Sequence, residues 1–300
     1  MSFVEAHSKG RVALSEPRYN RLSELPALYH WAVTPHRGLF KLKKLNKMNM
    51  KTKTNRHLVH IPLEFRIACS IYKLEPQEVL QIFINHATVY DSLADGYSEG
   101  FSECSKTIGL CVVSMRRTAN GSHAYDHCLE STALNFKGIH EIAKRQIGSA
   151  AAKRKSTLAY IDELYATMER VYTKSDTFYL DESTTLHFTK DFTVMCELHN
   201  CYPAEYLENF MSRISLAEME AKTGLGISND NFTMAFFMKI VLGFGMVDNE
   251  VPNLNAAEIA FVRAATELRV RMFTVRSLPK RISVFKELYH NRYEQIINQN

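Results

Sequence analysis

The most metal-like group of side chains in the sequence is the segment His123–Cys128, which reads HAYDHC. Two histidines four residues apart, here His123 and His127, can share one face of a helix and bind zinc. The segment contains no HExxH motif and follows an Asn120-Gly121 turn. Surface histidines at the start of a helix fit this context better, so we predict no metal site.

Motifs that would name a reaction are missing from the sequence. The glycines Gly224 and Gly226 lie outside any GxxxxGK[ST] or GxGxxG frame, so they do not predict a phosphate-binding loop. There is no GxSxG motif and no spaced Cys-His-Asn arrangement for nucleophilic catalysis. We therefore predict a protein that is not an enzyme and needs no cofactor.

The positive charge is concentrated at the N-terminus. The 300-residue chain has a net charge of +5, yet residues 1–56 alone hold 12 basic and 3 acidic residues. Such a basic arm is typical of a solvated segment that contacts phosphate groups. Its acid-free stretch supplies the nucleic-acid contacts that we predict: Lys41, Lys43, Lys44, Lys47, Lys51, Lys53 and Arg56.

A second interpretation of the arm concerns where translation starts. A chain that begins at Met50 would read MKTKTNRHLVHIPLEF, which is a plausible natural start. Residues 1–47 would then be a leader or a misassigned start, and most of the electrostatic argument for DNA would disappear.

Two segments of the chain resemble each other without gaps, with Leu58 aligned to Thr185; we call this spacing the repeat offset. Between Leu58–His86 and Thr185–Arg213, seven of 29 ungapped positions are identical, where chance would give about two. The identical pairs fall on apolar and turn positions and include His60/His187, Phe65/Phe192 and Phe83/Phe210. We predict two units of one type, residues 57–180 and 181–300, behind the arm formed by residues 1–56.

Each unit is expected to open with a short strand and a helical hairpin. Alternating apolar residues predict strands at 58–61 and 185–188. Apolar residues with helical spacing follow and predict a first helix in each unit. A second helix is expected to start at Pro76 in the first unit and at Pro203 in the second. Long helices are expected over 150–172, 253–274 and 280–297, and a buried helix over 234–244. The predicted fold class is mainly α, with two tandem helical units of about 120 residues.

A strand followed by two helices, at 58–90 and 185–217, resembles the ribbon-helix-helix family of DNA-binding repressors. The resemblance implies that the two strands pair antiparallel and place outward side chains in the major groove of double-stranded DNA. Those side chains would be Arg56, Leu58, His60, Ser183, Thr185 and His187. The glycine expected at the end of the first helix is Lys73 in one segment and Asn200 in the other.

The sequence therefore leaves two functions open. DNA binding, with a regulatory role, follows from the arm and the paired strands. A protein-interaction or scaffold module of helical repeats follows if the charged arm is dispensable. The sequence has no apolar run long enough to cross a membrane and no secretory signal, and its six cysteines are too few for a disulfide scaffold. We predict a cytoplasmic protein.

Overall fold

The fold is mainly helical, as the sequence predicts. A computed structural model describes residues 59–93, 104, 106–107, 129–169, 177–179, 185–198, 203–228, 231–243 and 254–299. The arm formed by residues 1–56 lies outside the described residues. None of the described helices is long and apolar enough to cross a membrane.

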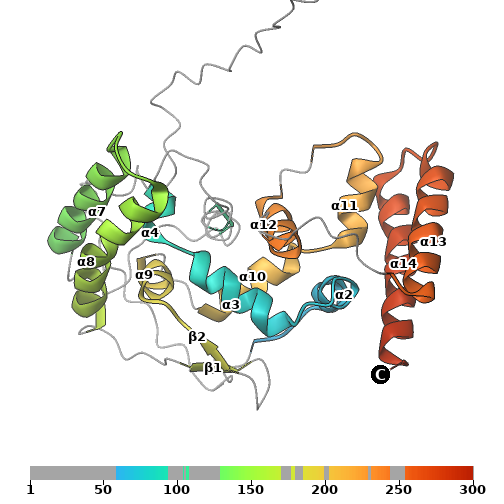
Figure 1. Cartoon of the computed structure of the whole chain (residues 1–300), viewed down its shortest axis with the longest axis horizontal. Coiled ribbons are helices and arrows are strands. Elements are labelled where there is room, and N and C mark those ends of the chain that lie inside the picture. Colours follow the sequence, from blue (N-terminus) through green and yellow to red (C-terminus); the bar gives the residue numbers. More distant parts are fainter. Residues whose placement is uncertain are drawn as a thin grey trace, which may run out of the picture.

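The helices form a central group with a helical pair on each side (Figure 1). The pair α7 and α8 lies at one edge of the molecule, and α13 and α14 lie at the opposite edge. The elements in chain order are α2 (Leu63–Ile71), α3 (Pro76–His86), α4 (Val89–Leu93), α7 (Leu129–Lys144), α8 (Ala150–Glu169), β1 (Thr177–Tyr179), β2 (Thr185–His187), α9 (Lys190–Leu198), α10 (Pro203–Ser212), α11 (Leu216–Thr223), α12 (Phe232–Val241), α13 (Ala256–Met272) and α14 (Leu278–Ile297).

Several helix starts match local signals in the sequence. Helix α3 begins at Pro76, whose fixed φ suits the first helical turn and whose missing N–H is not needed there. Helix α10 begins at Pro203 for the same reason. Asn255 and Glu258 form a reciprocal capping box at the start of α13, which satisfies two otherwise unpaired backbone donors.

Helix positions recur along the chain at the repeat offset. Helices α2 and α9 agree at both ends, and α3 and α10 start at equivalent residues. The same offset relates the first residues of α4 and α11, and those of α7 and α13. The recurrence therefore extends beyond the aligned segments of the sequence.

An aromatic cluster joins the two helical hairpins at the centre. The rings of Phe83 and Phe210 stack with centroids 4.2 Å apart, and both side chains are completely buried. Phe65 meets Phe210 edge-on at 6.2 Å, and Phe192 meets Phe83 edge-on at 6.3 Å. Since the repeat offset relates Phe65 to Phe192 and Phe83 to Phe210, the two edge-on contacts are equivalent.

The predicted pairing of the two strands is wrong. Residues 59–61 form no strand, although Val59 is buried. Strand β2 does form, but it pairs antiparallel with β1, with Phe178 opposite Leu186. A hairpin partner a few residues away has a much smaller loop-closure cost than a segment at the start of the other unit.

Candidate functional site

The predicted nucleic-acid residues of the arm cannot be placed. All seven, Lys41, Lys43, Lys44, Lys47, Lys51, Lys53 and Arg56, lie outside the described residues. Only His60, Thr185 and His187 of the predicted contacts fall within them.

These three residues do not form a shared ribbon. Thr185 lies in β2 opposite Tyr179 of β1. The residues His60 and His187 each lie beside the second helix of the other hairpin. The His60 N–H donates to Glu208 Oε1 at 3.5 Å, and the His187 N–H donates to Gln81 Oε1 at 2.9 Å. Gln81 and Glu208 are also related by the repeat offset, so these two contacts are a second equivalent pair.

The metal-like segment His123–Cys128 lies outside the described residues. Within the part of the chain that the structure describes, no group of three or more His, Cys, Asp or Glu side chains could hold a metal ion.

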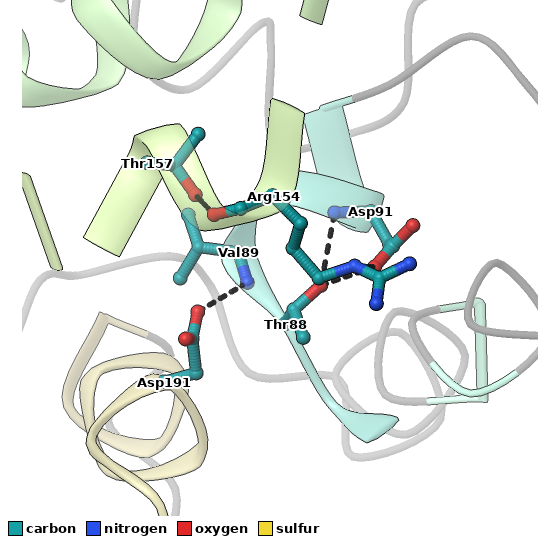
Figure 2. A network of polar contacts seen from close by, with 6 residues as sticks. All are labelled: Thr88, Val89, Asp91, Arg154, Thr157 and Asp191. Atoms are coloured by element: carbon teal, nitrogen blue, oxygen red, sulfur yellow. Dashed lines mark hydrogen bonds and ion pairs between the residues drawn. The ribbon is translucent and has the colours of Figure 1, made fainter. Parts of the chain in front are cut away.

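A buried polar network joins α4, α8 and α9 (Figure 2). The Arg154 guanidinium of α8 lies 3.3 Å from Asp91 Oδ2, and the Asp91 side chain is almost fully buried. The Thr88 hydroxyl donates to the same carboxylate, while the Asp91 N–H donates back to Thr88 Oγ1 at 3.1 Å. Asp191 of α9 accepts a hydrogen bond from the Val89 N–H at 2.9 Å. The network therefore fixes the first turn of α4 against two other helices.

Burial raises the pKa of Asp191 to about 6, and the negative charges of Asp91 and Asp162 add to this effect. The Val89 N–H and the positive charge of Arg154 act in the opposite direction. A raised pKa can mark a catalytic acid or base. Here one carboxylate oxygen is already bonded to the backbone at a helix start, which indicates a structural role.

A similar arrangement with different side chains lies at the start of α11, at positions related to Thr88 and Asp191 by the repeat offset. Ser215 Oγ accepts from the Glu218 N–H at the start of α11, and it donates to Glu64 Oε2 of α2 at 3.1 Å. Glu64 also contacts His290 and Lys286 of α14. Although burial raises the pKa of Glu64, the hydrogen bond from His290 and the charge of Lys286 bring it below its usual value. At the start of α4 and at the start of α11, an acidic side chain thus links the start of the helix to a neighbouring helix.

Helix α13 has apolar residues on two separate faces. Ala265, Leu268 and Met272 are buried on the inner side, and α13 packs there against α14. On the outer side Ile259 and Val262 are each 48% exposed, Val270 is 71% exposed and Phe273 is 70% exposed. We call the exposed residues Ile259, Val262, Thr266, Val270 and Phe273 the α13 stripe. Their spacing of three and four residues places them along one face of the helix.

Two exposed charged residues border the α13 stripe. Arg263 and Glu267 are one helical turn apart, so they lie on the same side of the stripe. The sequence predicts this helix but not its outer face. The signal in the sequence was a second set of apolar residues with helical spacing, at 259, 262, 270 and 273, in addition to the set that is buried.

Comparisons with protein families, curated proteins and solved structures find no match, so the site is interpreted from its own residues.

Proposed function

We propose that the protein is a non-enzymatic protein-interaction module built from two related units, residues 57–180 and 181–300. The equivalent helix starts, the equivalent aromatic contacts and the two equivalent histidine contacts support this duplication. The observation that carries the interaction function is the α13 stripe. Contiguous apolar faces on the surface of a soluble protein usually mark interaction sites.

We propose that the partner at the α13 stripe is a second copy of the chain, bound with its α13 antiparallel. A twofold axis through Thr266 places Ile259 of one copy opposite Phe273 of the other, and Val262 opposite Val270. The apolar positions therefore complement themselves, as an isologous dimer requires. The stripe from 259 to 273 is about 21 Å long, which is enough for a two-helix contact.

The charges beside the stripe support the same orientation. In an antiparallel pair related by a twofold axis, the same side of each helix faces the other. Arg263 of one copy then lies near Glu267 of the other, and the pair occurs twice. In a parallel pair the equivalent sides of the two helices lie on opposite sides of the interface, so the pairs between Arg263 and Glu267 would not form.

The oligomeric state tests this proposal. We expect the full chain to be dimeric by light scattering and sedimentation at protein concentrations up to about 100 µM. Replacing both Val262 and Val270 with Asp should give a monomer with unchanged helical content. The matched control is Leu134→Asp, because Leu134 is also exposed, at 65%, and belongs to α7, a helix at the opposite edge of the molecule. A wild-type protein that stays monomeric would overturn the proposal.

Charge reversal tests the orientation. Arg263→Glu or Glu267→Arg alone should weaken the dimer by about tenfold, because each turns two attractive pairs into repulsive ones. The double variant restores opposite charges and should recover the wild-type affinity. A double variant as weak as the single variants would rule out the antiparallel pairing.

DNA binding stays a prediction from the sequence. It is favoured by the charge of residues 1–56, which lie outside the described residues. Among those described, the two strand segments do not pair with each other, so the groove-contacting ribbon has no structural support.

A further inference from the structure

A cavity of about 610 Å³ lies between α2, the start of α3 and the helical pair α13–α14. Its walls combine apolar side chains such as Phe261 and Ile296 with three basic residues, Arg66, Lys73 and Arg292. Small-molecule sites in proteins have similar volumes and a similar mixture of apolar walls and a few polar groups.

Arg292 is the main polar group of this cavity. Arg292 as a whole residue is only 7% exposed. Within the described part of the chain, its side chain makes one hydrogen bond, a long one of 3.4 Å from Nη1 to Gln295 Oε1. The guanidinium also lies over the Phe261 ring, 5.9 Å from its centroid, and its charge acts on Glu258. A guanidinium carries five N–H donors, and no Arg292 nitrogen is among the fully buried unpaired atoms of the described residues. The position of Arg292 on the cavity wall lets a bound anion accept from the remaining donors.

The nearby acidic residues only partly offset this positive charge. Lys73 Nζ contacts Glu258 Oε1 at 2.7 Å, and Glu258 Oε2 also accepts from the Asn255 N–H of the capping box. Glu258 is therefore paired mainly with Lys73 and with the start of α13, and the positive charge of Arg292 makes a smaller contribution to the lowered pKa of Glu258. Glu75 is the other acidic residue on the wall, and it lies at the start of α3.

Arg66 is the second group available to an anion. It is exposed on α2, and its side chain has no ion pair among the described residues. The planar guanidinium of arginine can donate two parallel hydrogen bonds to the oxygen atoms of a phosphate or carboxylate group. Such charge-assisted hydrogen bonds are about twice as strong as hydrogen bonds between neutral groups.

The one thiol on the wall does not add reactivity. Burial raises the pKa of Cys69 to about 12, and the negative charge of Glu75 adds to the shift. The thiol is thus protonated at neutral pH and is a poor nucleophile. The chemistry of the cavity is therefore binding rather than covalent catalysis.

We propose that this cavity binds a small organic anion, with its phosphate or carboxylate group held by Arg66 and Arg292 and its apolar body against Phe261. Phe261 faces the cavity, whereas the α13 stripe faces outward, so this site does not depend on the dimer. Either proposal can fail without the other.

A pair of fluorescent probes tests the site in the full chain. Anilinonaphthalene sulfonate carries an anionic group on an aromatic body, and N-phenyl-naphthylamine has a similar body without the charge. We expect the sulfonate probe to bind saturably, and its affinity should fall about tenfold in Arg66→Gln and in Arg292→Lys. The first substitution removes a charge-assisted hydrogen bond, and the second replaces the planar guanidinium, which can donate two parallel hydrogen bonds, with an ammonium group. Arg66→Gln changes an exposed residue, so its fold should be intact. The matched control is Arg145→Gln, an exposed arginine between α7 and α8.

The uncharged probe separates anion recognition from apolar adsorption. Its binding should be the same in the wild type and in all three variants. Sulfonate binding that is absent, or equal in Arg66→Gln and Arg145→Gln, would overturn the proposal. Displacement by inorganic phosphate or by acetate at matched ionic strength identifies the preferred head group, and displacement by neither counts against anion recognition.

Discussion

Two acidic side chains with little exposure act at the start of helix α4. Asp91 and Asp191 hold the first turn of α4, one from within the helix and one from α9. Asp191 accepts a backbone hydrogen bond near the positive end of a helix, where a carboxylate is favoured. Its burial works against ionisation and gives the stability of the fold a dependence on pH.

We expect Asp191→Asn to remove part of that dependence. The pKa of Asp191 is raised from 3.8 to about 6 in the folded chain, mainly by burial. The folded state then binds more protons than the unfolded state between these values, so the stability of the wild type falls as pH rises through this window. The difference corresponds to on the order of 3 kcal/mol. Urea unfolding should show equal stabilities near pH 4 and a more stable variant at pH 7.

Asp162→Asn is the matched control for this experiment. Asp162 is an exposed carboxylate on α8 that pairs with Lys190 at 2.6 Å. An exposed ion pair contributes about 1 kcal/mol or less. The fall in stability with pH should therefore persist in this control, slightly reduced because the charge of Asp162 makes a small contribution to the raised pKa of Asp191. If it also persists unchanged in Asp191→Asn, the raised pKa of Asp191 is not its source.

Arg154 shows how much a single residue's position can reveal. The run Lys153-Arg154-Lys155 indicates a charged, solvated helix face, yet Arg154 pairs with a buried carboxylate. The signal in the sequence was the position of Arg154 on the helix. It shares one face with residues 157, 161, 164 and 168, and these four residues are all buried. Arg281, its equivalent under the repeat offset, is also buried and donates to the Ala221 carbonyl at 3.0 Å.

At the scale of elements, local signals predicted the helices well. Proline marks the starts of α3 and α10, and helical apolar spacing identifies α2 and α9. The strand predicted over residues 58–61 is not formed by its described residues, because alternation indicates which side chains are buried and not which backbone they pair with. Val59 is buried as alternation predicts, but no strand forms over residues 59–61.

The stacked pair Phe83 and Phe210 links α3 to α10, and we expect Phe210→Ala to cost about 3–5 kcal/mol of unfolding free energy. Both rings are completely buried, so their loss leaves a cavity at the junction of the two hairpins. Phe83→Ala should cost a similar amount, since the two residues occupy equivalent positions. Chemical denaturation of each variant measures these costs.

A double-mutant cycle isolates the contact between the two rings. The coupling between Phe83 and Phe210 should reach about 0.5–1.5 kcal/mol, as found for aromatic pairs. Leu134→Ala, on the surface of α7, should change stability by about 0.5 kcal/mol or less. Purely additive effects of the two phenylalanine substitutions would show that the stacking contributes little.

At the scale of the whole molecule, the candidate sites depend on contacts that no local pattern predicts. Arg66 and Arg292 line one cavity although one lies on the first described helix and the other on the last. Their side chains carry no sequence signal that distinguishes them from other surface arginines. The α13 stripe could be found from periodicity, but its exposure depends on where α14 packs.

The shared aromatic core leads to a prediction about cooperativity. Residues 57–180 and 181–300, here called the two halves, each bury a phenylalanine against the other. The side chains of Gln81 and Glu208 accept hydrogen bonds from backbone groups across the same junction. Neither half can therefore complete its core alone, and we expect one cooperative transition on unfolding in urea. Far-ultraviolet and near-ultraviolet circular dichroism should give coincident curves at protein concentrations that keep the oligomeric state fixed. The separate fragments 57–180 and 181–300 should each lack near-ultraviolet signal and recover it when mixed. Two resolved transitions, or a fragment that folds alone, would show that the halves are independent domains and that the central phenylalanines only dock preformed units.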